Sequence, residues 1–132
     1  LLPDGQLLVN ELAPRPHNSG HYTYDACTTS QFEQFLRAVL DLPLHSPTLR
    51  QAAAMVNLLG QHQEAFAQQF DRLPSDVKIH WYGKEEAKVG RKMGHLTFLG
   101  ESPADVIEQV EQTFIWPPLS DEEREVLRKV VG

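Results

Sequence analysis

One short segment concentrates side chains that can bind ions or transfer protons. Between Asn10 and His21 lie a carboxylate, a guanidinium, two imidazoles, two carboxamides and a hydroxyl, with two prolines among them. Surface loops are usually polar, so a solvated loop and a functional loop are both consistent with this composition. The combination of charge types in a proline-stiffened stretch nevertheless makes it the first candidate for a site.

Each group in this segment suggests a chemical role. Glu11, beside Asn10, can offer oxygen ligands to Mg²⁺, which binds through one or two carboxylates plus substrate phosphates. Arg15 can hold a carboxylate or phosphate with its planar fork, and His17 can transfer protons near neutral pH. The backbone N–H groups near Ser19 can face an anion. Taken singly, an exposed glutamate or a structural histidine is the commoner outcome.

A second candidate is a basic patch in a chain whose formal net charge is −6. The segments Tyr82–Lys84 and Gly90–His95 contain three cations, and their glycines allow a close approach of the backbone to a ligand. The functional interpretation is an anion pocket for a phosphate monoester, formed by Lys84, Arg91 and Lys92. The alternative is an exposed charged hairpin, a role that we assign to Lys88 with Glu85 and Glu86.

Composition limits the remaining possibilities. A length of 132 residues indicates one domain, or one domain plus part of another. The negative charge argues against non-specific nucleic-acid binding, and the sequence has no apolar run long enough to cross a bilayer. The single cysteine, Cys27, cannot form an intrachain disulfide; we interpret it as a buried small residue of a cytoplasmic protein. His45 and His62 show no ligand spacing and are expected at the surface.

Hydrophobic periodicity predicts an α+β fold that would position these groups. A turn at Pro3–Gly5 precedes a predicted strand over Gln6–Leu12, whose hairpin partner would lie upstream, and residues 14–30 are predicted to be loop. Thr29 or Ser30 caps an amphipathic helix over Gln31–Leu42. Ala52–Leu59 is predicted to be a short buried strand, although its alanines are also compatible with a helix. Gln61–Phe70 is predicted to be a helix.

The same local patterns predict the elements in the second half of the sequence. Strands are predicted over Val77–Tyr82 and Lys92–Leu99, then a helix from Ala104 to about Phe114 with Ser102–Pro103 at its start. An extended apolar tail over 115–119 leads to a capping box at Ser120–Glu123 and a last helix that ends at Val130.

Two stretches of this sequence resemble one enzyme family. The segment Val9–Glu33 and the segment Gly90–His95 look like the motifs of N5-carboxyaminoimidazole ribonucleotide synthase, also described as the ATPase subunit of phosphoribosylaminoimidazole carboxylase. Met55–Gly60 also resembles this family of ATP-grasp ligases. The resemblance covers roughly residues 6–100 and is weak beyond Phe114.

The resemblance implies a fold and a reaction. Residues 1–30 would be the last strand and active-site loop of an ATP-grasp core, 31–114 a small C-terminal mixed sheet-and-helix domain, and 115–132 a tail and helix. Family members carboxylate the exocyclic amine of 5-aminoimidazole ribonucleotide with ATP and bicarbonate, through carboxyphosphate, in purine biosynthesis. Mg²⁺ lies on the phosphates.

The resemblance also assigns roles to residues. Asn10 and Glu11 match the metal and ATP-phosphate position, and Arg15 and His17 match residues near the carboxyphosphate or CO₂ and the amine, with His17 handling a proton. The cations around the ribose phosphate would be Lys84, Arg91 and Lys92, and Lys84 is also counted as catalytic. Asn18 and Ser19 would help to fix the ribonucleotide.

The departures from the family pattern lead to further expectations. The sequence contains no glycine-rich phosphate loop, adenine-pocket strand or first metal-binding carboxylate, and it begins without Met. We therefore expect the C-terminal third of such a ligase, inactive alone, with the missing N-terminal part of the same enzyme as a partner. A homodimer is also expected, through the first strand and an exposed tail at Ile115–Trp116.

Three alternatives remain open at this point. The chain could belong to another ATP-grasp carboxylase or ligase, although His17–His21 and Gly90–His95 argue against this. It could be a non-catalytic module that binds a phosphate ligand or assists assembly. The parent protein could also continue into a mutase domain beyond residue 132.

Overall fold

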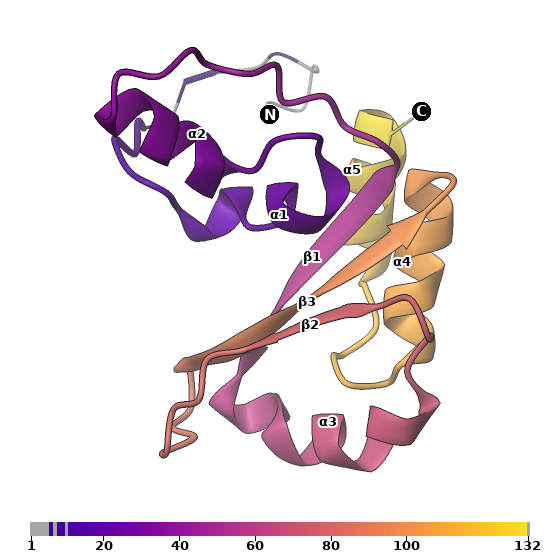
Figure 1. Ribbon diagram of the computed structural model, residues 1–132. Helices are drawn as coiled ribbons and strands as arrows, with labels where there is room; N and C mark the ends of the chain where they lie inside the picture. The colour runs from indigo at the N-terminus through magenta and orange to yellow at the C-terminus, as the bar shows by residue number, and fades with distance from the viewer. Residues whose placement is uncertain (1–5, 7, 10, 132) are drawn as a thin grey trace.

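The computed structural model describes residues 6, 8–9 and 11–131, and it has the α+β architecture predicted from the sequence (Figure 1). A three-stranded sheet forms its centre, and helices are attached at several sides. The elements in chain order are η1 (Asn18–Gly20), α1 (Thr23–Ala26), α2 (Gln31–Val39), β1 (Ala52–Leu59), η2 (Gly60–His62), α3 (Gln63–Gln69), η3 (Phe70–Arg72), β2 (Lys78–Trp81), β3 (Lys92–Gly100), α4 (Pro103–Gln112) and α5 (Asp121–Val131).

The sheet is antiparallel, with strand order β1-β3-β2. β3 is the central strand: it pairs with β1 from Ala52↔Gly100 onward and with β2 from Lys78↔Thr97 to Trp81↔Gly94. Gly94 is required by this close pairing, because a Cβ there would lie 2.4 Å from the carbonyl oxygen of His80. The glycine that the sequence suggested for a close approach to a ligand therefore serves the approach of a neighbouring strand.

One face of the sheet carries the hydrophobic core. Leu58, Leu96 and Phe98 point to this face, where α4 packs against β1 and β3 and Phe66 of α3 closes one end. The chain after α4 returns to the same cluster: Ile115 is 5% exposed and Trp116 packs against it. The expected exposed tail is therefore wrong at these two residues, because the chain turns back at Phe114, which buries Ile115 and half-buries Trp116 against the core.

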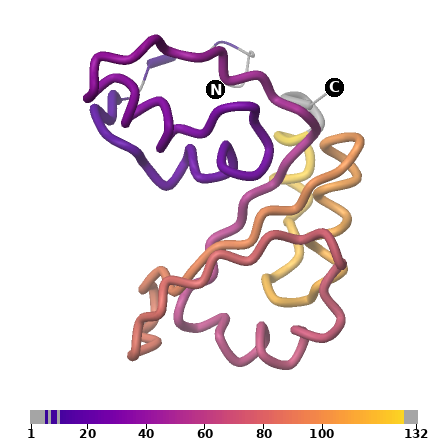
Figure 2. The backbone as a smooth tube through the Cα atoms, in the orientation of Figure 1, coloured from indigo at the N-terminus to yellow at the C-terminus, as the bar shows by residue number. Residues whose placement is uncertain are grey.

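The opposite face is buried as well, but by a different segment. Side chains alternate along a strand, so Met93, His95 and Thr97 point away from the core cluster that holds Leu96 and Phe98. All three are almost fully buried. On this face the ring of His21 contacts that of His95. Figure 2 shows the course of the segment that contains His21: the chain passes through η1, α1 and α2 beside the sheet and then crosses over these helices before it enters β1.

The N-terminal prediction needs correction. The described residues 6, 8–9 and 11–13 form no strand, and Leu8, Val9 and Leu12 are exposed. A strand needs a paired neighbour for its backbone groups, and none is present in the described part of the chain. The Pro3–Gly5 turn and Asn10 lie outside the described residues. The loop predicted for residues 14–30 also contains two short helical turns, η1 and α1.

Helix boundaries agree closely with the local signals. Ser30 caps α2 by accepting a hydrogen bond from Glu33 N, and Ser102 caps α4 in the same way. The capping box at Ser120 and Glu123 is confirmed by bonds of 3.2 and 2.8 Å. α2 ends at Val39, before the predicted Leu42, and Asp41 follows with a φ of 54°. No helix in the described ranges is long and apolar enough to span a membrane.

Candidate functional site

A row of three polar side chains crosses the sheet. Asn57 of β1 and His80 of β2 are both register partners of His95 in β3, so the three lie side by side on one face. The imidazole rings of His80 and His95 are stacked, with centroids 4.4 Å apart and planes inclined by 11°. This row is the platform of the candidate site.

The polar segment identified in the sequence docks on this row. The amides of Asn18 and Asn57 exchange two hydrogen bonds, of 2.8 and 2.9 Å. The ring of His21 lies 5.1 Å from that of His95, and Asp25 Oδ2 lies 2.7 Å from His80 Nε2. The spacing of residues 18, 21 and 25 matches one face of the helical turns η1 and α1. The two motifs, far apart in sequence, therefore meet.

His95 is a buried, neutral group of this platform. Its side chain is 5% exposed, and burial lowers its pKa to about 4, with further lowering from His80 and His21 and an opposing effect of Asp25. Nδ1 lies 2.7 Å from the hydroxyl of Tyr82, whereas Nε2 has no hydrogen-bond partner among the described residues. This contact connects the platform to Tyr82, where the basic hairpin begins.

His17 presents one ring nitrogen to solvent. Its Nδ1 accepts a hydrogen bond from the backbone N–H of Ser19 at 3.3 Å and lies 2.9 Å from the Ser19 hydroxyl. These contacts assign Nδ1 as the acceptor, so the hydrogen of the neutral ring belongs on Nε2. The side chain is exposed, and Nε2 is the atom left for a ligand.

His21 connects the segment to the basic hairpin. Burial lowers its pKa first, and the charge of Lys92 lowers it further, followed by His17 and His80. The ring of His21 also contacts that of His95, the last residue of the segment Gly90–His95. The cationic hairpin and the polar segment thus share one side of the molecule.

The three predicted cations differ in their surroundings. Lys84 Nζ donates to the carbonyl of Lys92 at 2.6 Å and lies 5.5 Å from the centroid of the Tyr82 ring. Arg91 Nη1 donates to the carbonyl of Glu86 at 3.2 Å, which leaves its other N–H groups for a ligand, and Lys92 is exposed. Lys88 instead pairs with Glu86 Oε2 at 2.7 Å, in agreement with its assignment to the exposed charged face.

The predicted metal position has little support from the residues described. Glu11 is exposed, Asn10 is not described, and the described part of the chain has no group of three acidic, histidine or cysteine side chains arranged to hold a metal. Arg15 is exposed as well, and its Nη1 donates to the carbonyl of Pro16. Glu11 alone does not define a magnesium site, so no chemical step is derived through the metal.

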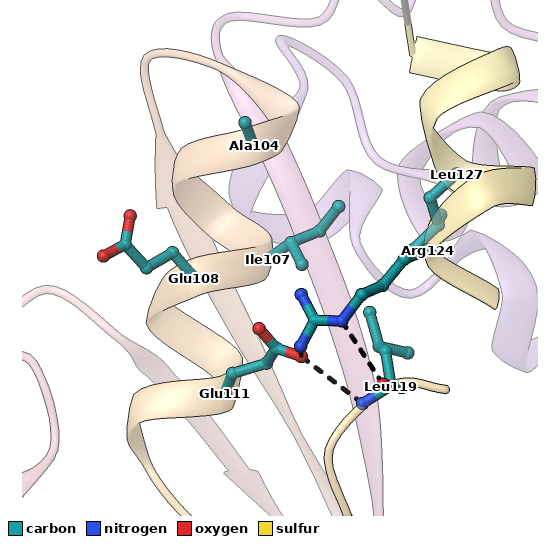
Figure 3. A pocket seen from close by; sticks show the side chains of 7 residues that line it. All are labelled: Ala104, Ile107, Glu108, Glu111, Leu119, Arg124 and Leu127. Carbon is teal, nitrogen blue, oxygen red and sulfur yellow. Dashed lines mark hydrogen bonds and ion pairs between the residues drawn. The ribbon is translucent and has the colours of Figure 1, made fainter. Parts of the chain in front are cut away.

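A separate cavity of about 400 Å³ lies between α4 and α5 (Figure 3). Its lining is mostly apolar, with Ile107, Leu119 and Leu127 facing it. Its two charged groups that face each other, Glu111 and Arg124, form an ion pair. Because that pair is already satisfied, and the cavity is lined by neither motif, the platform remains the better candidate.

Several residues of the platform were not identified from the sequence. Asp25, Gln31, Asn57 and Tyr82 lie within segments singled out in the sequence but received no role there, and His80 lies outside these segments. One signal was available: pairing the two predicted strands around the hairpin would have placed His80 opposite His95.

The three remaining single residues have mixed outcomes. Cys27 is half-buried, whereas burial was expected, and its backbone forms a bridge with Leu49. His45 is exposed as predicted. His62 is half-buried, because its Nδ1 accepts from Leu59 N and its ring contacts Trp116.

Family models match both parts of this arrangement. The ATP-grasp domain model matches residues 1–32, which include the polar segment, and the phosphoribosylaminoimidazole carboxylase C-terminal domain model matches residues 53–109, which include the sheet and the hairpin. Together they define the class of protein: the ATP-grasp family, with a match to its ATP-grasp domain followed by a match to the carboxylase C-terminal domain.

Individual relatives narrow the class. N5-carboxyaminoimidazole ribonucleotide synthase of Bacillus subtilis is 52% identical over 110 residues, which are 83% of this chain and 29% of the relative. A solved synthetase in complex with ADP is 48% identical, with a TM-score of 0.81 over 92% of this chain and 31% of that one. The synthase of Aspergillus clavatus, solved with ADP and 5-aminoimidazole ribonucleotide, is 38% identical, with a TM-score of 0.75 over 86% and 31%.

The chain belongs to the N5-carboxyaminoimidazole ribonucleotide synthase family. It spans about 30% of the length of the relatives that it matches.

Proposed function

We propose that this chain forms the part of an N5-carboxyaminoimidazole ribonucleotide synthase that holds 5-aminoimidazole ribonucleotide during its carboxylation with ATP and bicarbonate. The observation that carries the proposal is the contact between the two motifs: the ring of His21 lies 5.1 Å from that of His95, and Asn18 is bonded to Asn57, the register partner of His95. The Aspergillus clavatus synthase, which shares this fold, was solved with the same ribonucleotide.

In this proposal the hairpin binds the ribose phosphate. Lys84, Arg91 and Lys92 supply positive charge to a phosphate monoester, and the planar fork of Arg91 suits two phosphate oxygens. The carbonyl of Lys92 and the ring of Tyr82 hold Lys84 in place. Asn18 and Ser19, in η1, fix the ribonucleotide from the other side.

Arg15 and His17 then face the reacting groups. The exocyclic amine nitrogen forms a bond to the carboxyl carbon of carboxyphosphate and loses a proton, while the bond from that carbon to the bridging oxygen breaks and inorganic phosphate leaves. Negative charge resides on the carboxyl and phosphate oxygens. The guanidinium of Arg15 stabilises these oxygens. His17, oriented by Ser19, exchanges a proton or donates a hydrogen bond through Nε2.

ATP and Mg²⁺ enter the proposal through the family. ATP use is supported by the ATP-grasp match and by the relatives solved with ADP or ATP. Glu11, together with Asn10, is proposed to face the metal and the ATP phosphates, and Mg²⁺ would supply charge neutralisation there. The protein is proposed to work in the cytoplasm.

Association with further protein is also part of the proposal. The apolar side of α2 is exposed, with Phe35 43% and Val39 64% accessible. This face, and not the buried Ile115, is proposed to contact the rest of the enzyme or a second copy.

A binding experiment tests the central claim. An isotope-labelled chain is titrated with 5-aminoimidazole ribonucleotide, and we expect saturable shifts of the backbone signals of Ser19 and Arg91. Arg91→Ala should weaken binding at least tenfold, whereas Lys88→Ala, which removes a cation already paired with Glu86, should not.

Two results count against the proposal. No saturable binding by the folded chain would overturn it. Equal affinity for ribose 5-phosphate would show that only the phosphate is recognised and would favour the non-catalytic phosphate-ligand module.

A further inference from the structure

The side-chain amide of Gln31 clamps the backbone of His17. Gln31 Oε1 accepts from His17 N at 2.9 Å, and Nε2 donates to the carbonyl of the same residue at 2.8 Å. Nε2 also lies 2.8 Å from Nδ1 of His21, and because Nε2 is a donor, that ring nitrogen is the acceptor. One amide therefore uses both of its hydrogens and its oxygen on two histidines of the polar segment.

Gln31 is itself held firmly. It is the first residue of α2, whose start is fixed by the Ser30 cap. Its backbone N donates to Thr23 Oγ1 at 2.9 Å, and that hydroxyl donates to the carbonyl of Gly20 at 2.6 Å. A Cβ at Gly20 would lie 2.5 Å from Gln31 Oε1, so the glycine makes room for the amide.

The clamp controls the residue that the proposed function places next to the reacting groups. His17 is exposed, and its ring contacts Ser19. Its backbone is held by three hydrogen bonds: its N–H donates to Gln31, and its carbonyl accepts from Gln31 and from the N–H of Gly20. Loss of the amide would release the His17 N–H and one of the bonds to its carbonyl. Misplacement of a reacting group by about 1 Å is enough to reduce catalysis strongly.

We propose that Gln31 is a positioning residue, which acts through the backbone of His17 and the ring of His21 to hold the ribonucleotide-binding segment in its binding geometry. The inference rests on the proposed function. It concerns a residue of the segment Val9–Glu33 to which the resemblance assigned no role in binding or catalysis.

The chain offers a matched control. Gln34, one turn further along α2, clamps His45 in the same manner: it accepts from His45 N at 3.1 Å and donates to the His45 carbonyl. His45 is exposed and belongs to neither motif. Gln31→Leu and Gln34→Leu therefore remove the same chemical pattern from the same helix, but only the first affects the candidate site.

The Gln31→Glu variant adds a readout that a purely structural role would not change. A carboxylate still accepts from His17 N, but it has no hydrogen to donate, so the bonds to the His17 carbonyl and to the unprotonated Nδ1 of His21 are lost. The charged and titratable groups around His21 are Lys92, His17, His80, His95 and the introduced carboxylate. The carboxylate raises the pKa of His21, and the protonated ring then donates to it.

The experiment measures affinity for 5-aminoimidazole ribonucleotide by calorimetry at pH 8 and pH 6, each as a ratio to the unmodified chain at the same pH. We expect Gln31→Leu to lose at least tenfold at both values and Gln31→Glu to lose at least tenfold at pH 8 but to regain part of it at pH 6, where the His21 contact returns and the bond to the His17 carbonyl does not. Gln34→Leu should stay within twofold. Hydrogen exchange of the His17 amide should accelerate at least tenfold in Gln31→Leu only.

The outcomes separate this inference from the function that it rests on. Unchanged affinity in either Gln31 variant, or unchanged His17 exchange in Gln31→Leu, with normal binding by the unmodified chain, would overturn the positioning role alone. Equal losses in the Gln31→Leu and Gln34→Leu variants would do the same. Absence of binding by the unmodified chain would instead overturn the proposed function, and the role in binding with it. If Gln31→Leu does not fold, Gln31→Glu at the two pH values decides.

Discussion

Asn18 and Asn57, 39 positions apart, exchange two amide hydrogen bonds of 2.8 and 2.9 Å. Asn57 also receives a third bond at its carbonyl oxygen, from Trp116 Nε1 at 3.0 Å. Asn57 therefore joins the polar segment on one face of the sheet to the hydrophobic core on the other. The position of the candidate site depends on this junction.

Replacement of Asn57 by alanine should destabilise the chain by about 1–3 kcal/mol, because the half-buried amide of Asn18 loses its partner. A double-mutant cycle with Asn18→Ala, measured by urea denaturation, should show a coupling of about 1 kcal/mol. Gln112→Ala, which removes an exposed amide bonded to Glu108, should change stability by less than about 0.5 kcal/mol. Strict additivity of the two asparagine substitutions would contradict the direct pairing.

Stability should fall as the pH decreases from 6.5 to 4. The pKa of His95 is lowered from 6.5 to about 4 in the folded chain, so the unfolded chain binds a proton at a higher pH than the folded chain does. The free energy of unfolding therefore falls as the pH decreases across this interval. The full effect is about 3 kcal/mol, and the lowered pKa of His21 acts in the same direction. Urea denaturation at several pH values measures it; His95→Gln should flatten the profile, and an unchanged slope would argue against burial of a neutral ring.

Two substitutions at Tyr82 should separate stability from ligand binding. Tyr82→Phe removes the hydroxyl that contacts His95 Nδ1 but keeps the ring near Lys84. It should cost about 1–3 kcal/mol of stability, because a buried nitrogen loses its partner, and leave affinity for the ribonucleotide nearly unchanged. Tyr82→Leu removes both contacts and should weaken binding as well. Equal affinity in the two variants would show that the ring does not hold Lys84.

Adjacent residues after α4 should respond very differently to truncation. Ile115→Ala should destabilise the chain by about 2–5 kcal/mol, because it opens a cavity in the core. Phe114→Ala should have an effect of less than about 1 kcal/mol, since that side chain is 77% exposed. Thermal denaturation of the two variants provides the comparison, and similar losses would contradict the buried position of Ile115.

We expect the 132-residue chain alone to form no N5-carboxyaminoimidazole ribonucleotide from ATP, bicarbonate and 5-aminoimidazole ribonucleotide. Its sequence has no glycine-rich phosphate loop, and Glu11 is the carboxylate assigned to the metal. Product formation, followed by isotope incorporation from labelled bicarbonate, is the measurement. Turnover above that of an Arg15→Ala, His17→Ala variant would refute the expectation.

Local sequence determined much of the secondary structure. The alternation of Val77–Tyr82 and the apolar content of Lys92–Leu99 placed two strands correctly, and Ser30, Ser102 and Ser120 marked three helix starts, because strand periodicity and capping are local effects. The described residues of the predicted Gln6–Leu12 strand form no strand and are not part of the sheet β1-β3-β2, because a strand exists only if a partner is available. The predicted catalytic and ligand-binding roles remain proposals.

The sequence by itself also supplied the chemistry: the polar segment around His17 and the cations around Arg91. Only the tertiary structure decided that these two groups meet, because the pairing of β2 and β1 with β3 aligns His80, His95 and Asn57 in one row, and Asp25, His21 and Asn18 dock along it. It also decided that Gln31 clamps His17 and that Ile115 is buried. Such contacts depend on strand register and chain reversal, which no local pattern encodes.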